Sequence, residues 1–384
     1  MGGVGRFFRA LGRTWAGLIG FVGLVFYAVL VFIGPLFVPF DNEVKTDQVN
    51  APPGSRLELV TRAADAERYT SLASLTGQVV GYVRSSAGED LVDPLEATFS
   101  NTEDYRRGSG VEDGLQDLMD NKLGALVLFS ESLKTYPIGP ETDFPDLAVS
   151  NAALGPRHLL GTDTQGRDIF SHIVNGGRTL IATALLAGLI STTIAVLLGS
   201  LAALLGGPVD RVLTALANFI LVLPRFPLLI VLAALFTLDN ILLLATLIGL
   251  LVWPALMRAV RAQVLSLRER DYVEAARALD LGRRHIIVRE ILPNMMSFVL
   301  INLILAVTFA MYDQIGLIFL GMAPINDYSW GVMLYFGRTR GALFSPDSAA
   351  MVLAPVVAIA LFQVSMVMFA RALEEVFDPR LRAA

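Results

Sequence analysis

The segment Asp271-Tyr-Val-Glu-Ala-Ala-Arg-Ala-Leu-Asp-Leu-Gly-Arg-Arg-His-Ile-Ile-Val-Arg-Glu-Ile-Leu-Pro-Asn294 is strongly charged, yet long apolar stretches flank it on both sides. Asp271 is suited to cap the N-terminus of a short helix, and Glu274 lies three residues later, where a capping box places its carboxylate. Four residues follow the i, i+3, i+4, i+7 spacing and would share one helix face: Tyr272, Ala275, Ala276 and Leu279. The two alanines keep that face shallow. The spacing therefore predicts a short amphipathic helix shaped to press into a groove of another protein.

The second half of this segment carries residues that end and restart helices. Gly282 is suited to stop the short helix, two arginines follow it, and Pro293 suits the first turn of the next helix. The residues alone leave two interpretations open. One is a docking helix in a basic loop, and the other is a loop that only joins two membrane helices.

The composition indicates a protein that crosses a membrane several times. Of 384 residues, 54% are apolar and only 17% are charged, a balance that fits a multispanning protein better than a soluble one. There is no cysteine, and the three histidines are far apart and form no His-Glu-x-x-His pattern, so no metal site is predicted. None of the three lysines follows a glycine, which excludes the usual phosphate-binding loop of ATPases.

Charge is distributed unevenly along the chain. Residues 41–150 hold 20 acidic and 9 basic side chains, a net charge of -11, whereas the rest of the chain carries a net charge of +6. This asymmetry predicts that the two parts lie on opposite sides of a membrane.

Apolar runs and arginine positions predict an all-α polytopic protein with six transmembrane helices and both termini in the cytoplasm. About 20 apolar residues are needed to span a bilayer, and the first run is too long for the core of a signal peptide. The inner loop at 258–290 holds 8 arginines and 5 acidic residues, as the positive-inside rule expects. The spans are expected at roughly 16–38, 179–209, 212–237, 241–257, 293–319 and 349–370.

The chain is expected to have three parts. Residues 1–40 hold the N-terminal tail and the first span, and residues 41–155 form a small α+β insertion on the outer face between the first two helices. Residues 156–384 form a five-helix core with the inner loop and a cytoplasmic C-terminal tail.

Within the insertion, the patterns predict three strands and one helix, at 57–60, 78–83, 124–129 and 112–121 respectively. About 110 residues would be long for an unstructured loop, although a partly disordered acidic loop remains the alternative. Patterns alone do not assign a role to the insertion.

Several motifs resemble one family. Glu274-Ala-Ala276 and Ile291-Leu-Pro293 resemble the EAA loop in the permeases of binding-protein-dependent ABC importers. His158-Leu-Leu-Gly-Thr-Asp-Thr-Gln-Gly-Arg-Asp168 is similar to the segment before the second membrane helix in dipeptide and oligopeptide permeases of the C type. Ser329-Trp-Gly331 and Asp378-Pro-Arg380 resemble later motifs of that family. The resemblance covers roughly residues 155–382 and the first helix.

The chain departs from the family pattern after the glutamate. The family's glycine usually lies six residues later, where this chain has Asp280, and Gly282 comes two residues after that. This departure predicts a turn shifted along the sequence at the end of the helix.

The resemblance implies the type I ABC importer permease fold and a transport subunit rather than an enzyme. In this family the short helix couples the permease to an ATPase, so no catalytic residue, cofactor or metal is expected in this chain, and ATP and Mg²⁺ belong to partner ATPase subunits. We expect the coupling contacts to come from seven residues: Glu274, Ala275, Ala276, Arg277, Asp280, Gly282 and Arg283. The expected partners are a second permease, two ATPase subunits, an extracytoplasmic binding protein and the lipid bilayer of a bacterial or archaeal inner membrane, with no nucleic acid.

Two charged residues lie within predicted spans. Arg225 lies between two prolines in the third span, and Asp313 precedes Gln314 in the fifth. Charges at membrane depth usually pair or face a cavity. We therefore expect Arg225 and Asp313 to approach each other, or to line one translocation pathway with Gln314. The alternative is that the charged groups extend to the lipid headgroups.

Other functions remain open at this level. The resemblance points to peptides as the transported solute, with oligosaccharides or nickel complexes as alternatives. A channel or a membrane receptor with an outer sensing domain is a more remote alternative, since neither needs a docking helix on its inner loop. An intramembrane enzyme would need paired catalytic groups at membrane depth, and no such His/Glu pair is present.

Overall fold

The computed structural model describes residues 14–40, 44–45, 48–84, 86–106, 109–152, 154, 157–236, 238, 240–282, 285–323, 329–344 and 348–377. The described residues fall into two compact units, of which the first is helical and the second contains a β-sheet. Unit 1 lies within Met1–Val38, Val174–Tyr335 and Pro355–Ala384, and unit 2 within Pro39–Ile173 and Phe336–Ala354.

Five segments of the described chain are long and apolar enough to cross a membrane. The first, Trp15–Leu36, consists of α2 (Trp15–Ala28), a π-helix (Val29–Ile33) and a 3₁₀ turn (Gly34–Leu36). The other four are α6 (Ile169–Leu205), α9 (Ile241–Arg268), α13 (Met296–Phe319) and residues Ala350–Glu374 of α15 (Ala350–Phe377). These segments agree with five of the six predicted spans.

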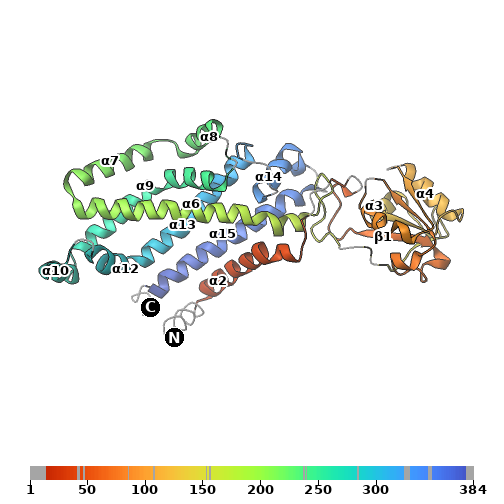
Figure 1. Cartoon of the computed structure of the whole chain (residues 1–384), viewed down its shortest axis with the longest axis horizontal. Coiled ribbons are helices and arrows are strands. Elements are labelled where there is room, and N and C mark those ends of the chain that lie inside the picture. Colours follow the sequence, from red (N-terminus) through yellow and green to blue (C-terminus); the bar gives the residue numbers. More distant parts are fainter. Residues whose placement is uncertain are drawn as a thin grey trace. The chain divides into compact units, whose positions relative to one another are not determined.

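The third predicted span is a broken helix and not a continuous one. Helices α7 (Gly207–Val222) and α8 (Arg225–Leu235) meet at an angle of 85° (Figure 1). Pro224 has no backbone N–H to continue a helix and pushes the preceding Leu223 into extended geometry, with ψ at 134°. The third predicted span at 212–237 therefore corresponds to a bent pair of apolar helices, and the break at Pro224 divides it.

Several helix ends differ from the predicted spans. Helix α6 begins ten residues before 179 and ends at Leu205, before Gly206 and Gly207, which both have positive φ (63° and 54°). Helix α9 continues past 257 to Arg268, and α13 begins at Met296 because the short helix α12 (Leu292–Asn294) takes up Pro293. Charged residues mark where an apolar span ends in the sequence. They do not end the helix, because its backbone hydrogen bonds can continue into the aqueous phase.

Small residues allow the long helices to approach closely. A Cβ at Gly20 of α2 would lie 2.4 Å from the backbone nitrogen of Phe369 in α15. A Cβ at Gly188 of α6 would lie 3.0 Å from the Val307 nitrogen in α13, and one at Gly199 would lie 2.7 Å from a carbonyl oxygen of α9. Membrane helices associate through such backbone contacts because lipid removes the hydrophobic drive that acts in water.

Between α13 and α15 the chain forms helix α14 (Trp330–Thr339) and a 3₁₀ turn (Ala342–Phe344). Trp330 is fully buried, and its ring meets that of Tyr27 edge-on at 6.0 Å. A Cβ at Gly177 of α6 would lie 2.6 Å from the same indole. The Ser-Trp-Gly motif therefore packs α14 against α2 and α6.

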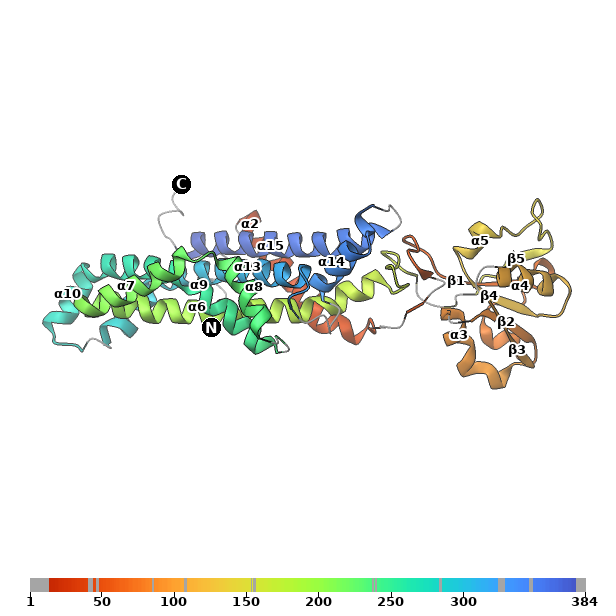
Figure 2. The ribbon, with the colours of Figure 1, turned by 90° about the horizontal axis from the view of Figure 1, so that it is seen from above.

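Unit 2 contains a five-stranded mixed sheet in the order β3-β2-β4-β1-β5 (Figure 2). The strands are β1 (Leu57–Arg62), β2 (Val79–Val83), β3 (Asn101–Tyr105), β4 (Ala125–Phe129) and β5 (Leu147–Val149). Strand β2 runs parallel to β3 and β4, whereas β1 runs antiparallel to β4 and β5. The helical elements are α3 (Ala87–Val92), α4 (Ser109–Met119), α5 (Ser132–Thr135) and 3₁₀ turns at Ala63–Asp65, Leu72–Leu75 and Asp93–Thr98.

Both faces of this sheet are covered. Leu59 and Val127 point into one buried cluster, and Val60, Leu126 and Leu128 point into another. Every residue of β4 is buried, which explains its continuous apolar sequence. The three predicted strands and the predicted helix are confirmed. The sequence analysis missed β3, a polar edge strand, and the short β5.

The turn-rich motif before α6 holds two distant segments of unit 2 together. The Thr162 hydroxyl accepts a hydrogen bond from the Ala51 backbone N–H at 2.8 Å. The buried Asp163 carboxylate accepts hydrogen bonds from the backbone and side chain of Arg167, both at 3.0 Å. Gly166 has φ 78°, and a Cβ there would lie 1.8 Å from the Lys45 carbonyl oxygen. This motif is therefore structural.

We predict that Gly166→Ala destabilises the protein more than Gly54→Ala does. Both glycines have positive φ, but a Cβ at Gly54 meets no atom within 4 Å. The control variant Gly54→Ala should lose about 1 kcal/mol of unfolding free energy, because alanine is strained at positive φ. Gly166→Ala should lose about 3 kcal/mol or more, because the backbone at Lys45 must also move. Thermal unfolding of the purified chain in detergent measures both, and equal losses would contradict the packing argument.

Candidate functional site

The charged segment forms a short helix, α10 (Asp271–Ala278), between α9 and α13. The carbonyl oxygen of Arg270 accepts the backbone N–H of Glu274 at 3.1 Å, so Arg270 occupies the capping position. Asp271 and Glu274 both lie in the first turn of α10, where the helix dipole favours a negative charge. The prediction that Asp271 caps the helix was therefore off by one residue, because Asp271 is the first residue of the helix and Arg270 precedes it.

Helix α10 is attached to the membrane helices by an apolar cluster. Val273 is fully buried, and Ala276 is 5% exposed. They share a buried cluster with residues of α6, α7, α9 and the π-helix η7 (Ile286–Ile291): Ala203, Ala217, Val260, Val264, Ile286 and Ile291. This burial fixes one side of α10 to the bundle.

The opposite side of α10 leaves apolar residues uncovered. Tyr272 is 37% exposed, Leu279 is 73% exposed, and Ala275 and Glu274 between them are also exposed. The predicted face of four residues was thus partly wrong, since Ala276 turns inward with Val273. An uncovered surface with a tyrosine, a leucine and a carboxylate around a shallow alanine is suited to a protein partner.

The turn after α10 is not shifted along the sequence. Asp280 has φ 50°, and the Leu281 backbone N–H donates to the Ala276 carbonyl oxygen at 3.1 Å. This bond closes the helix end as in a Schellman motif, with Asp280 at the left-handed position that glycine usually takes. Gly282 is not in the left-handed region, so the predicted stop at Gly282 and the predicted shift were both wrong. Aspartate tolerates this conformation better than most residues.

Two predicted coupling residues cannot be placed. Arg283 lies outside the residues that the structure describes, and so does the side chain of Arg277. Beyond that gap, the His285 imidazole lies 3.7 Å from the Glu290 carboxylate, and Arg268 at the end of α9 donates to the Ala203 carbonyl oxygen at 3.2 Å. The second contact ties the C-terminal ends of α9 and α6 together.

The two predicted charges in the spans form an ion pair. Arg225, at the start of α8, places Nη2 at 3.2 Å from Asp313 Oδ1 in α13. Its guanidinium also lies over the Phe309 ring, 5.6 Å from the centroid. The prediction that Arg225 and Asp313 approach each other is confirmed. The break at Pro224 makes the contact possible, because it places Arg225 in the first turn of a new helix.

The buried side of this pair retains unsatisfied polar atoms. Asp313 is 4% exposed and Gln314 is 2% exposed. Neither Asp313 Oδ2 nor Gln314 Oε1 makes a hydrogen bond within the described part of the chain. Each buried acceptor without a partner costs free energy. A role of these residues in a pathway stays a prediction.

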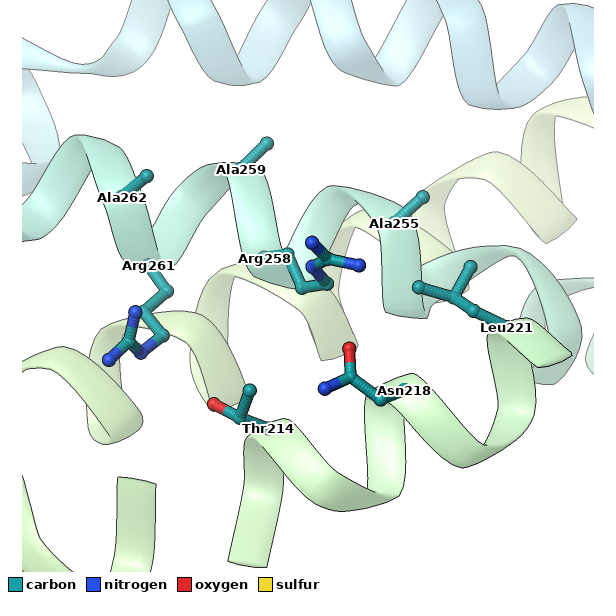
Figure 3. Close-up of a pocket in the computed structure, with 8 residues that line it drawn as sticks. All are labelled: Thr214, Asn218, Leu221, Ala255, Arg258, Ala259, Arg261 and Ala262. Carbon is teal, nitrogen blue, oxygen red and sulfur yellow. The ribbon is translucent and has the colours of Figure 1, made fainter. Parts of the chain in front are cut away.

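An open cavity of about 580 Å³, lined mostly by exposed residues, lies between α7 and α9 (Figure 3). The Arg258 guanidinium and the Asn218 amide point into the same space from the two helices. At one edge, Arg261 forms two hydrogen bonds of 2.5 Å with the Asp210 carboxylate. The sequence analysis missed this site, although Thr214 and Asn218 are polar residues at i, i+4 in an apolar helix and could have indicated it.

The architecture defines a polytopic helical membrane protein with a short, partly uncovered helix, α10, between two spans. The sequence model of the binding-protein-dependent transport system inner membrane component family matches residues 195–383. The oligopeptide transport system permease protein OppC of Mycobacterium tuberculosis (strain H37Rv) is 33% identical over 224 residues, which cover 57% of this chain and 76% of the relative. The chain belongs to this family of inner-membrane transport components.

Other relatives match a smaller share of their own length. A Brucella suis protein provisionally named a peptide permease is 36% identical over 52% of this chain and 66% of its own. OppC of Haemophilus influenzae is 33% identical over 48% of this chain and 59% of its own. The chain thus spans about two thirds of the Brucella relative, and the sheet of unit 2 lies before the family match.

One solved structure shows a slight likeness. It is an amino acid ABC transporter substrate-binding protein of Streptococcus pneumoniae bound to L-arginine, at 20% identity and a TM-score of 0.23. The match covers 29% of this chain and 46% of that protein. A likeness this low does not indicate a shared fold.

We predict that Asp280→Gly leaves stability unchanged within about 1 kcal/mol, because glycine adopts the left-handed conformation without strain. Asp280→Val should cost about 1–2 kcal/mol, since a β-branched side chain clashes there. Thermal unfolding in detergent measures the two variants. An equal effect of valine and glycine would contradict the left-handed turn.

We predict that Arg225→Asp and Asp313→Arg each impair the protein, and that the double exchange restores it in part. Breaking the pair should cost about 1–3 kcal/mol, because the buried Asp313 loses a charged hydrogen bond while Arg225 is 38% exposed and partly screened by solvent. The yield of folded protein and its thermal stability are measured for all three variants. If the double variant is as unstable as the worse single variant, the pair does not stabilise the fold.

Proposed function

We propose that this chain is the permease subunit of an ATP-binding cassette importer. Together with a second permease it would form the translocation path for a solute delivered by an extracytoplasmic binding protein. Family membership and the names of the relatives support this proposal, and those names favour peptides over oligosaccharides or nickel complexes. A channel or receptor is not favoured, because neither explains a docking helix on the inner loop.

The observation that carries the proposal is that α10 is buried on one side and exposed on the other. One side, Val273 and Ala276, is buried among the membrane helices, and the other exposes Tyr272, Glu274 and Leu279. A helix of this kind can receive a displacement at its exposed side and pass it to α9 and η7 at its buried side. We infer that one of two ATPase subunits docks on this exposed side.

ATP and Mg²⁺ are bound and used by those partner subunits. When the ATPases close on ATP, α10 would move as a rigid body with the apolar cluster, and the bundle would change from inward-open to outward-open. Packed interfaces suit this transition because they have discrete arrangements and do not deform continuously.

The ion pair of α8 and α13 suits the role of a pathway element. Arg225 keeps 38% of its side chain exposed, whereas Asp313 is buried with an unsatisfied Oδ2. A state that hydrates this oxygen would gain a hydrogen bond that the present state lacks. We propose that Arg225, Asp313 and Gln314 lie along the translocation path and change their contacts between states.

The proposed topology places both termini and α10 on the cytoplasmic side and the sheet on the outer side. The net charge of -11 over residues 41–150, against a net +6 elsewhere, supports this orientation. We propose that the acidic insertion either contacts the binding protein or covers the outer opening of the translocation path.

We predict that Glu274→Lys abolishes the stimulation of ATP hydrolysis by solute-loaded binding protein, while the permease still inserts. The lysine places the wrong charge at the centre of the proposed docking surface. Glu374→Lys makes the same charge change at an exposed position of α15 and should leave stimulation intact. ATPase assays of the reconstituted complex compare the variants, and full stimulation in Glu274→Lys would refute docking at α10.

A further inference from the structure

The α7–α9 cavity contains a cation that no group of the described chain neutralises. Eight residues line it: Thr214, Asn218, Leu221, Ala255, Arg258, Ala259, Arg261 and Ala262. Arg261 is paired with the Asp210 carboxylate. Arg258 has no carboxylate within ion-pair distance among the residues that the structure describes, so the lining carries one uncompensated positive charge. Arg258 is exposed on α9, at the first position of the inner loop expected at 258–290, so an anion from solution can reach it.

The lining is built to leave room beside this charge. Three alanines on α9, at positions 255, 259 and 262, flank Arg258 with short side chains. From α7, the Asn218 amide adds an uncharged donor, whereas the Thr214 hydroxyl donates to Asp210 Oδ1 at 3.2 Å. The volume of about 580 Å³ lies within the range of about 300–1,000 Å³ that is typical of small-ligand sites.

Both faces of helix α7 are exposed, and the face toward the cavity is the more polar of the two. Thr214, Asn218 and Leu221 recur at i, i+4 and i+7 and face the cavity. Val212 and Phe219 are both 65% exposed, and they lie on another side of the helix from these three residues. Lipid chains would favour the apolar face. The cavity face, with the Arg258 guanidinium and the Asn218 amide, suits a hydrated and negatively charged ligand.

We propose that the α7–α9 cavity binds the terminal carboxylate of a transported peptide, with Arg258 as its charged contact. The inference rests on the proposed peptide import. A guanidinium donates two parallel hydrogen bonds to a carboxylate, and the Asn218 amide is placed to donate a third. Every linear peptide with a free C-terminus carries this group whatever its sequence, so one site serves cargo of varied side chains. The room beside the three alanines accepts small side chains without selecting among them.

The test compares ATP-driven uptake of trialanine and trialanine amide by the complete complex in proteoliposomes with its binding protein. The binding protein contributes equally to every variant, so the acid-to-amide uptake ratio relative to the unaltered complex isolates the permease. Arg258→Gln should lower this ratio about tenfold, the effect of losing a charged hydrogen-bonded contact. Arg258→Lys should keep most of it. Arg211→Gln removes the same charge from an exposed position of α7 outside the cavity lining and should not change the ratio.

The outcomes separate this site from its alternatives. An unchanged acid-to-amide uptake ratio in Arg258→Gln overturns the carboxylate site. If the uptake of both peptides then falls equally, Arg258 contacts a lipid phosphate or the second permease instead. If Arg258→Gln fails to assemble, Asn218→Ala gives the same readout without a change of charge, with a fall of about threefold expected and no fall overturning the proposal. If the unaltered complex imports neither peptide, the proposed peptide import fails and the carboxylate site with it.

Discussion

Burial of Val273 and Ala276 connects the short helix α10 to the rest of the molecule. These two side chains share an apolar cluster with α6, α7, α9 and η7, so α10 cannot move without moving the helices behind it. Burying a side chain such as valine contributes about 1.5–3 kcal/mol, enough to hold an eight-residue helix that would not be stable alone in water. The same contact gives the exposed Tyr272 and Leu279 a fixed position for a partner.

The polar groups of the helical unit follow from the cost of charge in an apolar medium. Arg225 pairs with Asp313, and Arg261 pairs with Asp210. Each pair joins two helices that are distant in sequence and so restricts how the bundle can be arranged. Arg258 differs, because it forms no ion pair with any described residue and its guanidinium faces the α7–α9 cavity. Its side chain is exposed, so water or a ligand can reach the charge. This contrast within one helix singles out the α7–α9 cavity among the polar sites of the helical unit.

The two units solve different physical problems. The spans bring backbones together through Gly20, Gly188 and Gly199, since lipid gives no hydrophobic reason for helices to associate. The sheet of unit 2 buries both faces under apolar clusters, as a domain in water must. Left-handed glycines and the buried Asp163–Arg167 pair support the turns between β5 and α6.

The sequence by itself determined the membrane class, five of the spans, three strands and the position of the short helix α10, because apolar runs and local spacing depend on nearby residues. It also indicated that Arg225 and Asp313 would meet, since a charge within a span has few other solutions. Only the tertiary structure showed that the third span is broken and that Asp280 takes the left-handed turn in place of Gly282. It also turned Ala276 inward and opened the cavity beside Arg258. These features depend on which helices pack together, and packing between residues distant in sequence leaves no periodic signal in the chain.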